Sequence, residues 1–288
     1  MDIRLLDCRG REWHLAGENE GAEGVTLAEL GGLSGSFPDL EDGRGRFDAA
    51  ARHVGRLDSF NPKLSVWVEK TEGLTAASVA RRLLAGLDFF KPSKLVVSGA
   101  RMPELALFVH LSKPVDLPDK LNKNQFALEL ELVAHDGCWF GAEHRATGFA
   151  TIENTGDVPL WPVVRWHGLA ASIAEDRNGT ILLPPALGVS GLTYYTDPAT
   201  GGLVTDNQGY PNHKAWATMR GIAWTRPVMP GDGTTVDCTF CEIVWRNRYL
   251  APWSQTGGII SNAGTSNNQY GREWAAATGR PYAFRLFD

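Results

Sequence analysis

Residues 126–134, FALELELVA, decide the fold class of this chain. Apolar residues occupy every second position of this segment, a spacing typical of a strand with one buried and one solvated face. The segment runs into a turn and two aromatic residues, HDGCWF at 135–140, and a second extended segment, FATIENTGD at 149–157, ends in turn-forming residues. The stretch 126–166 therefore predicts the end of one β-domain and the start of another, with a seam near residue 145.

The rest of the chain also favours β-structure. Alternating apolar residues predict strands at 3–6, 12–15, 64–68, 95–97, 105–111, 163–166, 180–183, 194–205, 216–224 and 236–245. One helix is predicted over Ala76–Leu87, where Thr75 is a candidate N-cap and apolar residues share one face at i, i+4 and i+8. The fold class that follows is mainly β, with two β-sandwich-type domains and one helix, at about 75–88, in the first. Beyond the seam only β-structure is expected.

Three segments are expected along the chain. The first β-domain is predicted at 1–145 and the second at 146–253. Residues 254–288 form a C-terminal extension that is at first rich in glycine, serine, asparagine and threonine. A weak alternation of aromatic and apolar residues near its end predicts that the extension docks as a closing strand.

Composition excludes several classes of protein. The chain has 288 residues, a formal net charge of −5 and 43% hydrophobic residues. The acidic balance argues against a nucleic-acid partner, and no apolar run approaches the ~20 residues that span a bilayer. The amino terminus lacks the basic and apolar regions of a secretory signal. We therefore expect a protein made and assembled in the cytoplasm, without membrane insertion.

Two of the four cysteines, Cys238 and Cys241, form a C-x-x-C. A zinc site needs four ligands, and no second C-x-x-C or close histidine pair completes one. The pair lies in a predicted strand, where positions three apart face opposite sides, so a redox motif is not expected either. We predict reduced thiols in a β core, and neither a metal nor a cofactor.

None of the common catalytic motifs is complete in this sequence. The nucleophile elbow, the dinucleotide loop, the phosphate-binding loop and the zinc-protease helix each lack at least one required residue. The seven histidines are spaced singly. A glycoside hydrolase would need only two carboxylates that meet in space, and the candidates are Asp136, Glu153, Asp157 and Glu242. Their turn and solvated-strand positions favour structural roles, so we expect no enzyme.

Ten tryptophans raise the alternative of a carbohydrate-binding module, in which indole faces stack on sugar rings. Most of those in the second half lie in alternating strands, where core packing is the commoner role. Trp161 and Trp253 lie in loop-like contexts and are the candidates for exposed aromatic residues. The sequence leaves this alternative open.

Several motifs, in order, resemble the distal tail proteins, or minor tail proteins, of long-tailed siphophages. The motifs are AHDGCWF at 134–140, ENTGD at 153–157, PVVRWHG at 162–168, YYTDPATGGLVT at 194–205 and IVWRNRYL at 243–250. The opening segment GREWHLAG, at 10–17, is similar to the members from phages of actinobacteria. Gly137 departs from the family pattern, which usually has proline at that position.

The resemblance implies a structural role. In that family the first domain forms a ring, usually of six copies, coaxial with the tail tube, and the second is a galectin-like sandwich that projects outward. The implied location is the tail tip of the virion, and the implied partners are further copies of the chain, the tail-tube protein, the tail-tip hub and other minor tail proteins. Host cell-wall glycans are the partners in the carbohydrate-binding alternative. Asp136, Trp139, Asn154 and Gly156 are then expected to set the geometry of the domain junction.

Overall fold

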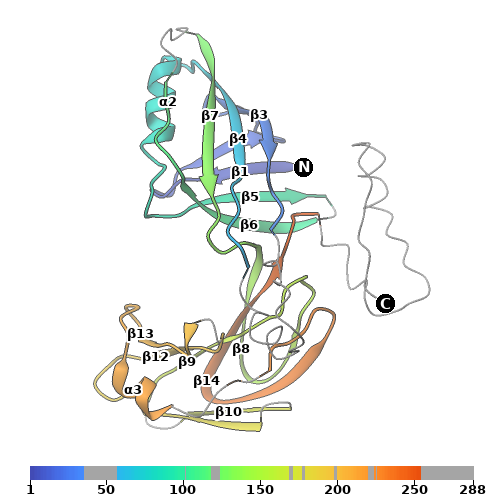
Figure 1. Ribbon diagram of the computed structural model, residues 1–288, viewed down its shortest axis with the longest axis vertical. Coiled ribbons are helices and arrows are strands. Elements are labelled where there is room, and N and C mark those ends of the chain that lie inside the picture. Colours follow the sequence, from blue (N-terminus) through green and yellow to red (C-terminus); the bar gives the residue numbers. More distant parts are fainter. Residues whose placement is uncertain are drawn as a thin grey trace, which may run out of the picture. The chain divides into compact units, whose positions relative to one another are not determined.

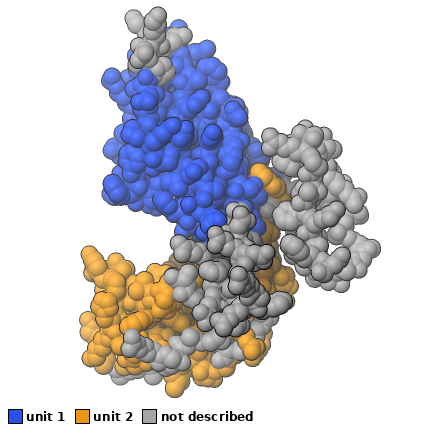
Figure 2. Space-filling model, viewed as in Figure 1, with its two compact units in different colours: residues 1–142, 248–252 blue, residues 143–247, 253–288 orange. Residues whose placement is uncertain are grey.

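The computed structural model describes residues 1–35, 57–100, 102–117, 124–168, 171–176, 179–197, 200–219, 224 and 226–253. These residues form mainly antiparallel β-structure with short helices (Figure 1). They divide into two compact units (Figure 2): unit 1 is Met1–Ala142 with Arg248–Pro252, and unit 2 is Glu143–Asn247 with the chain from Trp253. The predicted extension at 254–288, with its closing strand, lies outside the described residues.

Unit 1 is built from two groups of antiparallel strands and one helix. Its elements are β1 Asp2–Leu6, β2 Glu12–Ala16, β3 Val25–Gly31, β4 Lys63–Glu69, α2 Ala76–Leu84, β5 Ser93–Gly99, β6 Met102–Leu111, β7 Gln125–Val133 and the start of β8 Trp139–Glu153. One group has the order β2-β1-β5-β6, and β8 joins β6 where Ala106 pairs with Phe140. The other group has the order β3-β4-β7, and the end of β7 also pairs with β6.

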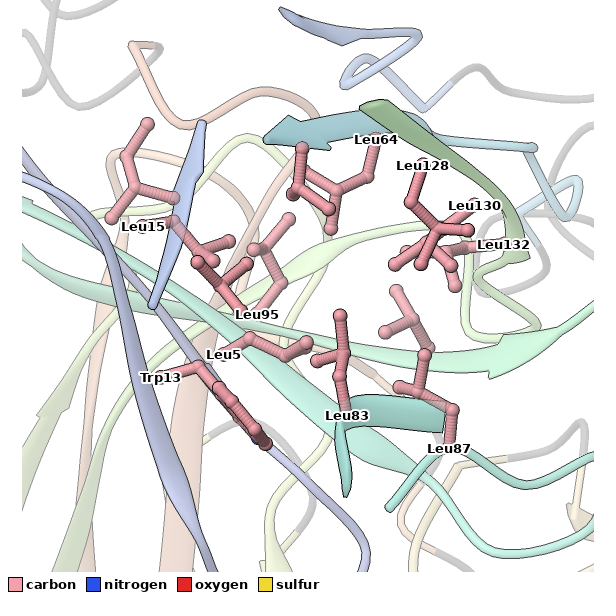
Figure 3. Close-up of a cluster of buried hydrophobic side chains, with 14 of the residues drawn as sticks. Leu5, Trp13, Leu15, Leu64, Leu83, Leu87, Leu95, Leu128, Leu130 and Leu132 are labelled. Atoms are coloured by element: carbon pink, nitrogen blue, oxygen red, sulfur yellow. The ribbon is translucent and has the colours of Figure 1, made fainter. Parts of the chain in front are cut away.

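The core of unit 1 lies where these strands and α2 converge (Figure 3). The alternation at 126–134 is confirmed: β7 buries Phe126, Leu128, Leu130 and Leu132 and turns the residues between them outward. The leucines of β7 lie beside Leu64 of β4 in the close-up. Each such leucine stabilises the fold by about 1.5–3 kcal/mol on full burial, so this face fixes the register of β7.

The helix α2 forms where it was predicted but ends earlier. Thr75 caps it, because its Oγ1 accepts a hydrogen bond from the backbone N–H of Ser78 at 3.3 Å. Val79 and Leu83 are fully buried and hold the helix on the core. The helix ends at Leu84, and Leu87 is buried beyond it, in the segment that leads to β5.

Unit 2 has its own core and continues β8. Its further elements are β9 Val163–Trp166, β10 Ala171–Glu175, β11 Gly179–Leu183, β12 Leu192–Tyr195, β13 Val204–Asp206, α3 His213–Thr218 and β14 Gly233–Tyr249. The strand order is β13-β12-β9-β14-β8, and β10 lies between β11 and a second part of β14. The core includes Ile152, Trp166, Ile173 and Ile243.

The structure differs from the sequence prediction in one element of this part of the chain. The strand expected at 216–224 is replaced at its start by α3, which Asn212 caps by accepting from the N–H of Ala215 at 3.0 Å; residues 220–223 lie outside the described chain. The chain crosses from unit 1 to unit 2 inside the continuous strand β8, and it returns to unit 1 at Arg248–Pro252. No helix of the described residues is long and apolar enough to cross a membrane.

Candidate functional site

The turn between β7 and β8 holds two of the residues predicted to set junction geometry. The N–H of Gly137 donates to the carbonyl of Ala134 at 3.3 Å, and Asp136 is exposed at the tip of the turn. Gly137 has a φ of 67°, and a Cβ atom there would lie 2.5 Å from the carbonyl oxygen of Asp58. Proline has a fixed negative φ, so the backbone itself explains why glycine stands where the resembled family usually has proline.

Trp139 anchors this turn in the core of unit 1. Its side chain is fully buried, and its Nε1–H donates to the carbonyl of Leu33 at 2.8 Å. Two residues later along that segment, the N–H of Gly35 donates to the carbonyl of Leu250 at 2.7 Å. The neighbouring thiol of Cys138 is also buried, which raises its pKa to about 12. The segment 33–35 therefore joins Trp139 to the stretch at Leu250 within unit 1.

Asn154 holds the turn that follows β8 in unit 2. It is 1% exposed, and its Nδ2 donates to the carbonyls of Val158 at 2.9 Å and Val228 at 2.8 Å. Its Oδ1 accepts from the N–H of Gly156 at 3.0 Å, and its own backbone N–H donates to Asp232 at 2.9 Å. A buried amide with both donors and its oxygen hydrogen-bonded fixes two loops at once.

The four residues predicted for junction geometry thus form two separate turn anchors. Asp136 and Trp139 belong to unit 1, whereas Asn154 and Gly156 belong to unit 2. Each pair organises a turn of its own unit, and a joint role at the junction stays a prediction.

The exposed aromatic residues are not those predicted. Trp161 is half-buried against the core of unit 2, and its buried Nε1 has no hydrogen-bond partner among the described residues. Trp253 is also half-buried. Among the described residues of unit 2, the exposed aromatic side chains are instead Phe149, Tyr210 and Phe240, at 76%, 67% and 78%. The position of Phe149 had a signal in the sequence, since it lies an odd number of residues from the buried Ile152.

Charged side chains link β8 to β14 within unit 2. Glu143 accepts hydrogen bonds from Nε of Arg145 at 2.7 Å and from Nη2 of Arg246 at 2.7 Å. The bond from Arg145 is the main cause that lowers the pKa of Glu143, and the bond from Arg246 adds to it against the opposing effect of partial burial. This group of ion pairs joins β8 to β14.

The candidate carboxylates are distributed over both units. Asp136 lies in unit 1, whereas Glu153, Asp157 and Glu242 lie in unit 2, where Glu242 is 3.8 Å from Arg165. Within the described ranges, no three or more histidine, cysteine, aspartate or glutamate side chains gather in a group that could hold a metal. Two histidines spaced singly in sequence do meet: the rings of His110 and His135 are 5.2 Å apart in unit 1.

Comparison with known proteins gives structural similarity only. No protein-family model matches the chain, and no curated protein matches it in sequence. Similar solved structures are the Dit protein of phage SPP1, at 12% identity and a TM-score of 0.49, and two structures of the phage P2 baseplate in its activated conformation, with Ca and with Sr, at 9% identity and TM-scores of 0.47 and 0.46. They cover 86%, 85% and 85% of this chain, and 99%, 97% and 97% of their own chains. The SPP1 protein is called a paradigm of the hub adsorption apparatus in phages that infect Gram-positive bacteria.

Proposed function

We propose that this chain is a structural protein of a siphophage tail tip, of the distal tail class. It forms a ring, with six copies expected, that joins the tail tube to the tail-tip hub of the virion. The observation that carries the proposal is the ordered series of sequence motifs, which span the chain from residue 134 to residue 250. Catalysis has no part in this role.

The motifs fall at points that control strand direction. The first forms the turn before β8, the second forms the Asn154 turn after β8, and the third contains β9. The fourth contains the end of β12 and the start of β13, and the fifth ends β14 at Tyr249, a core residue of unit 1. Motifs at turns and strand ends suit a protein whose function is to hold a shape.

Unit 1 supplies the ring in this proposal. β2 and β3 each pair with one strand among the described residues, so each has an edge with no described partner. Exposed strand edges pair readily with another chain, and closing a ring of identical copies satisfies all of them. The outer part of β3 carries the exposed residues Ala28 and Glu29. We propose that the edge of β3 contributes to the contact between copies.

Unit 2 is proposed to be a galectin-like sandwich that projects from the ring. Its partners would be other minor tail proteins, while the ring faces would meet the tail-tube protein and the hub. The carbohydrate-binding alternative lacks a specific supporting observation, since every described indole of unit 2 is buried or half-buried: Trp161, Trp166, Trp216, Trp224, Trp245 and Trp253. A fluorescence titration of the protein with host cell-wall sugars tests it directly.

Mass photometry and electron microscopy of the purified full-length chain test the ring. We expect oligomers of one defined size with a central opening, and binding of these oligomers to the end of a tail-tube assembly. The variant Ala28→Lys places a charge on the proposed edge and should shift the population to monomers. Ala174→Lys is the matched control, because Ala174 is an exposed alanine on β10 of unit 2. A chain that stays monomeric at every concentration and does not bind the tail tube would overturn the proposal.

A further inference from the structure

The C-x-x-C pair lies where β14 changes its partner strand. Cys238 pairs with Ile173 of β10, whereas Cys241 pairs with Trp166 of β9. Between them, Thr239 is the last residue of β14 to pair with β10. The two cysteines therefore belong to one strand but to two successive ladders.

A bulge at Phe240 turns both cysteines to the same side. Thr239 and Phe240 are consecutive exposed residues, which breaks the alternation of residues 233–238; it resumes at 241–243. Phe240 has a φ of 57°, in the left-handed region that bulges use and that bulky residues rarely adopt. The prediction that Cys238 and Cys241 face opposite sides of the strand was therefore wrong. The extra residue of the bulge shifts the alternation by one position, so that these two residues, three apart, lie on the same side. Both are buried, at 5% and 6% exposure.

The bulge places both thiols on the buried face of β14. Hydrogen bonding between them lowers the pKa of Cys238 and raises that of Cys241. Cys241 Sγ also lies 3.3 Å from the carbonyl oxygen of Ser172, which is the alternative acceptor for its one S–H. A thiolate stabilised by a neighbouring thiol is the arrangement from which disulfides form.

We propose that Cys238 and Cys241 form a reversible disulfide within the folded protein, which makes the β14 bulge a redox modification site. The inference is independent of the proposed tail function. Because both side chains are buried, the oxidant we assign is small, a hydroperoxide, rather than a disulfide on another protein.

The reaction balances in two steps. The thiolate of Cys238 attacks one oxygen of hydrogen peroxide, the O–O bond breaks, and hydroxide leaves, so that Cys238 becomes a sulfenic acid. The sulfur of Cys241 then attacks the sulfenic sulfur, the S–S bond forms, and water leaves. The thiol proton of Cys241 and the proton released by Cys238 are taken up by the two departing oxygens. Overall, two thiols lose two electrons and one peroxide is reduced to two molecules of water.

The other two cysteines lack this arrangement. Cys138 lies in the core of unit 1, where burial raises its pKa to about 12 and keeps it protonated at neutral pH. Cys8 is half-buried in the same unit, and all four thiols of the chain are free in this structure. We therefore expect the oxidation to be confined to one peptide of unit 2.

Mass spectrometry of the full-length protein tests the site. The reduced protein is treated with hydrogen peroxide, its remaining thiols are alkylated in denaturant, and the tryptic peptide 221–246, which holds both cysteines, is weighed. We expect that peptide to lose two hydrogen atoms and to escape alkylation until a reductant is added. The double variant Cys8→Ser, Cys138→Ser should behave identically, and Cys241→Ser should lose the disulfide. Two alkylated cysteines in the wild-type peptide, or a bond that involves Cys8 or a second chain, would overturn the proposal.

A second measurement needs no variant. The wild-type chain is equilibrated with glutathione redox buffers under native conditions and again in unfolding concentrations of urea. Because the bulge holds the two sulfurs together, we expect the disulfide to be at least about tenfold more stable in the native chain. Equal or lower stability in the native chain would show that the fold does not favour the bond, and would overturn the proposal.

Discussion

At the scale of single residues, the buried amide of Asn154 holds both the turn after β8 and the separate segment around Val228. Its Nδ2 bonds connect the turn at Val158 to the segment at Val228, which is 74 positions away in the chain. The amide donates to the carbonyl of Val158, and it shares the carbonyl of Val228 with the backbone N–H of Leu160, which donates to it at 2.9 Å. An unsatisfied buried carbonyl costs about 1–3 kcal/mol, so Asn154 is one of the most valuable polar residues in unit 2.

The substitution Asn154→Asp tests this account with almost no change in shape. It replaces two donors by a carboxylate oxygen that faces two carbonyls, so we expect a loss of about 3 kcal/mol in the free energy of unfolding of unit 2. Urea denaturation measures the loss. Asn207→Asp is the control, because Asn207 makes an exposed side-chain hydrogen bond, and its effect should stay below about 0.5 kcal/mol. Equal effects of the two substitutions would contradict the role of Asn154.

Gly137 allows a similar comparison in unit 1. Gly137→Ala adds a Cβ that would lie 2.5 Å from the carbonyl of Asp58, at a φ of 67°. Gly10→Ala shares the positive φ, at 81°, but its Cβ would meet no atom within 4 Å. We expect Gly10→Ala to cost about 1 kcal/mol, for backbone strain alone, and Gly137→Ala to cost about 3 kcal/mol in thermal or urea unfolding. Similar costs would mean that the turn relaxes around the added methyl group.

At the scale of elements, β14 combines a bulge, a change of partner and a charged link to β8. The bulge places Phe240, an exposed aromatic residue, in a backbone conformation that costs about 1–3 kcal/mol for a residue other than glycine. The strand keeps the conformation because both flanking ladders, to β10 and to β9, are formed.

Phe240→Gly should therefore stabilise the protein, by about 1 kcal/mol, because glycine adopts a positive φ without strain. Phe149→Gly is the matched control, since Phe149 is equally exposed but lies in β8 without a positive φ. There the same change should destabilise by about 1 kcal/mol, through the low strand propensity of glycine. Urea denaturation of both variants gives the two signs, and a loss of stability at both positions would contradict the strain at Phe240.

The link between β8 and β14 gives a pH dependence. Because the pKa of Glu143 is lower in the folded than in the unfolded chain, its stabilisation is complete above the unfolded value, about 4.3, and is lost as pH falls through the folded value. Glu143→Gln should lower stability at pH 7, by about 0.5 kcal/mol for such a partly exposed ion pair, and the difference should vanish in strong acid. Unfolding curves from pH 7 to about pH 2 measure it, and a deficit that grows in acid would reverse the assigned sign.

The predictability of these elements from sequence depended on their length. The alternation at 126–134 and the apolar face of the nine-residue helix at 76–84 were long enough to separate a period of two from a period of 3.6. The helix α3 has six residues, too few for that distinction, and was mistaken for a strand. The bulge at Phe240 inserts one extra residue into β14, and a sequence pattern does not show at which position a strand contains a bulge. In the same way Asn154 was predictable as a turn residue, but its partner Val228 was not.

At the scale of the whole molecule, unit 1 is discontinuous in sequence. Residues 1–142 make most of it, and Arg248–Pro252 complete it after the chain has passed through unit 2. This short segment is an integral part of unit 1, because Tyr249 is buried in the core of that unit and the carbonyl of Leu250 accepts a hydrogen bond from the N–H of Gly35. The turn motifs predict one boundary between the two domains, near residue 145. No local pattern at 248–252 shows which of the two cores that segment joins.

Tyr249→Ala should therefore destabilise unit 1, although Tyr249 ends the longest strand of unit 2. We expect a loss of about 3 kcal/mol, and hydrogen exchange resolved by peptide should accelerate in β1–β7 but not in β9–β13. Tyr210→Ala, which truncates a tyrosine of unit 2 that is 67% exposed, is the control and should change neither pattern. Acceleration confined to β9–β13 would assign Tyr249 to the other core.

The discontinuity of unit 1 also has a consequence for protein synthesis. A ribosome makes the chain from its amino terminus, so every residue of β9–β13 emerges before Tyr249 and Leu250 do. The nascent unit 1 thus lacks its last core residue and the acceptor for Gly35 until translation has passed residue 250. Closure of the amino-terminal unit is therefore a late event, and a chain released prematurely would leave that unit open.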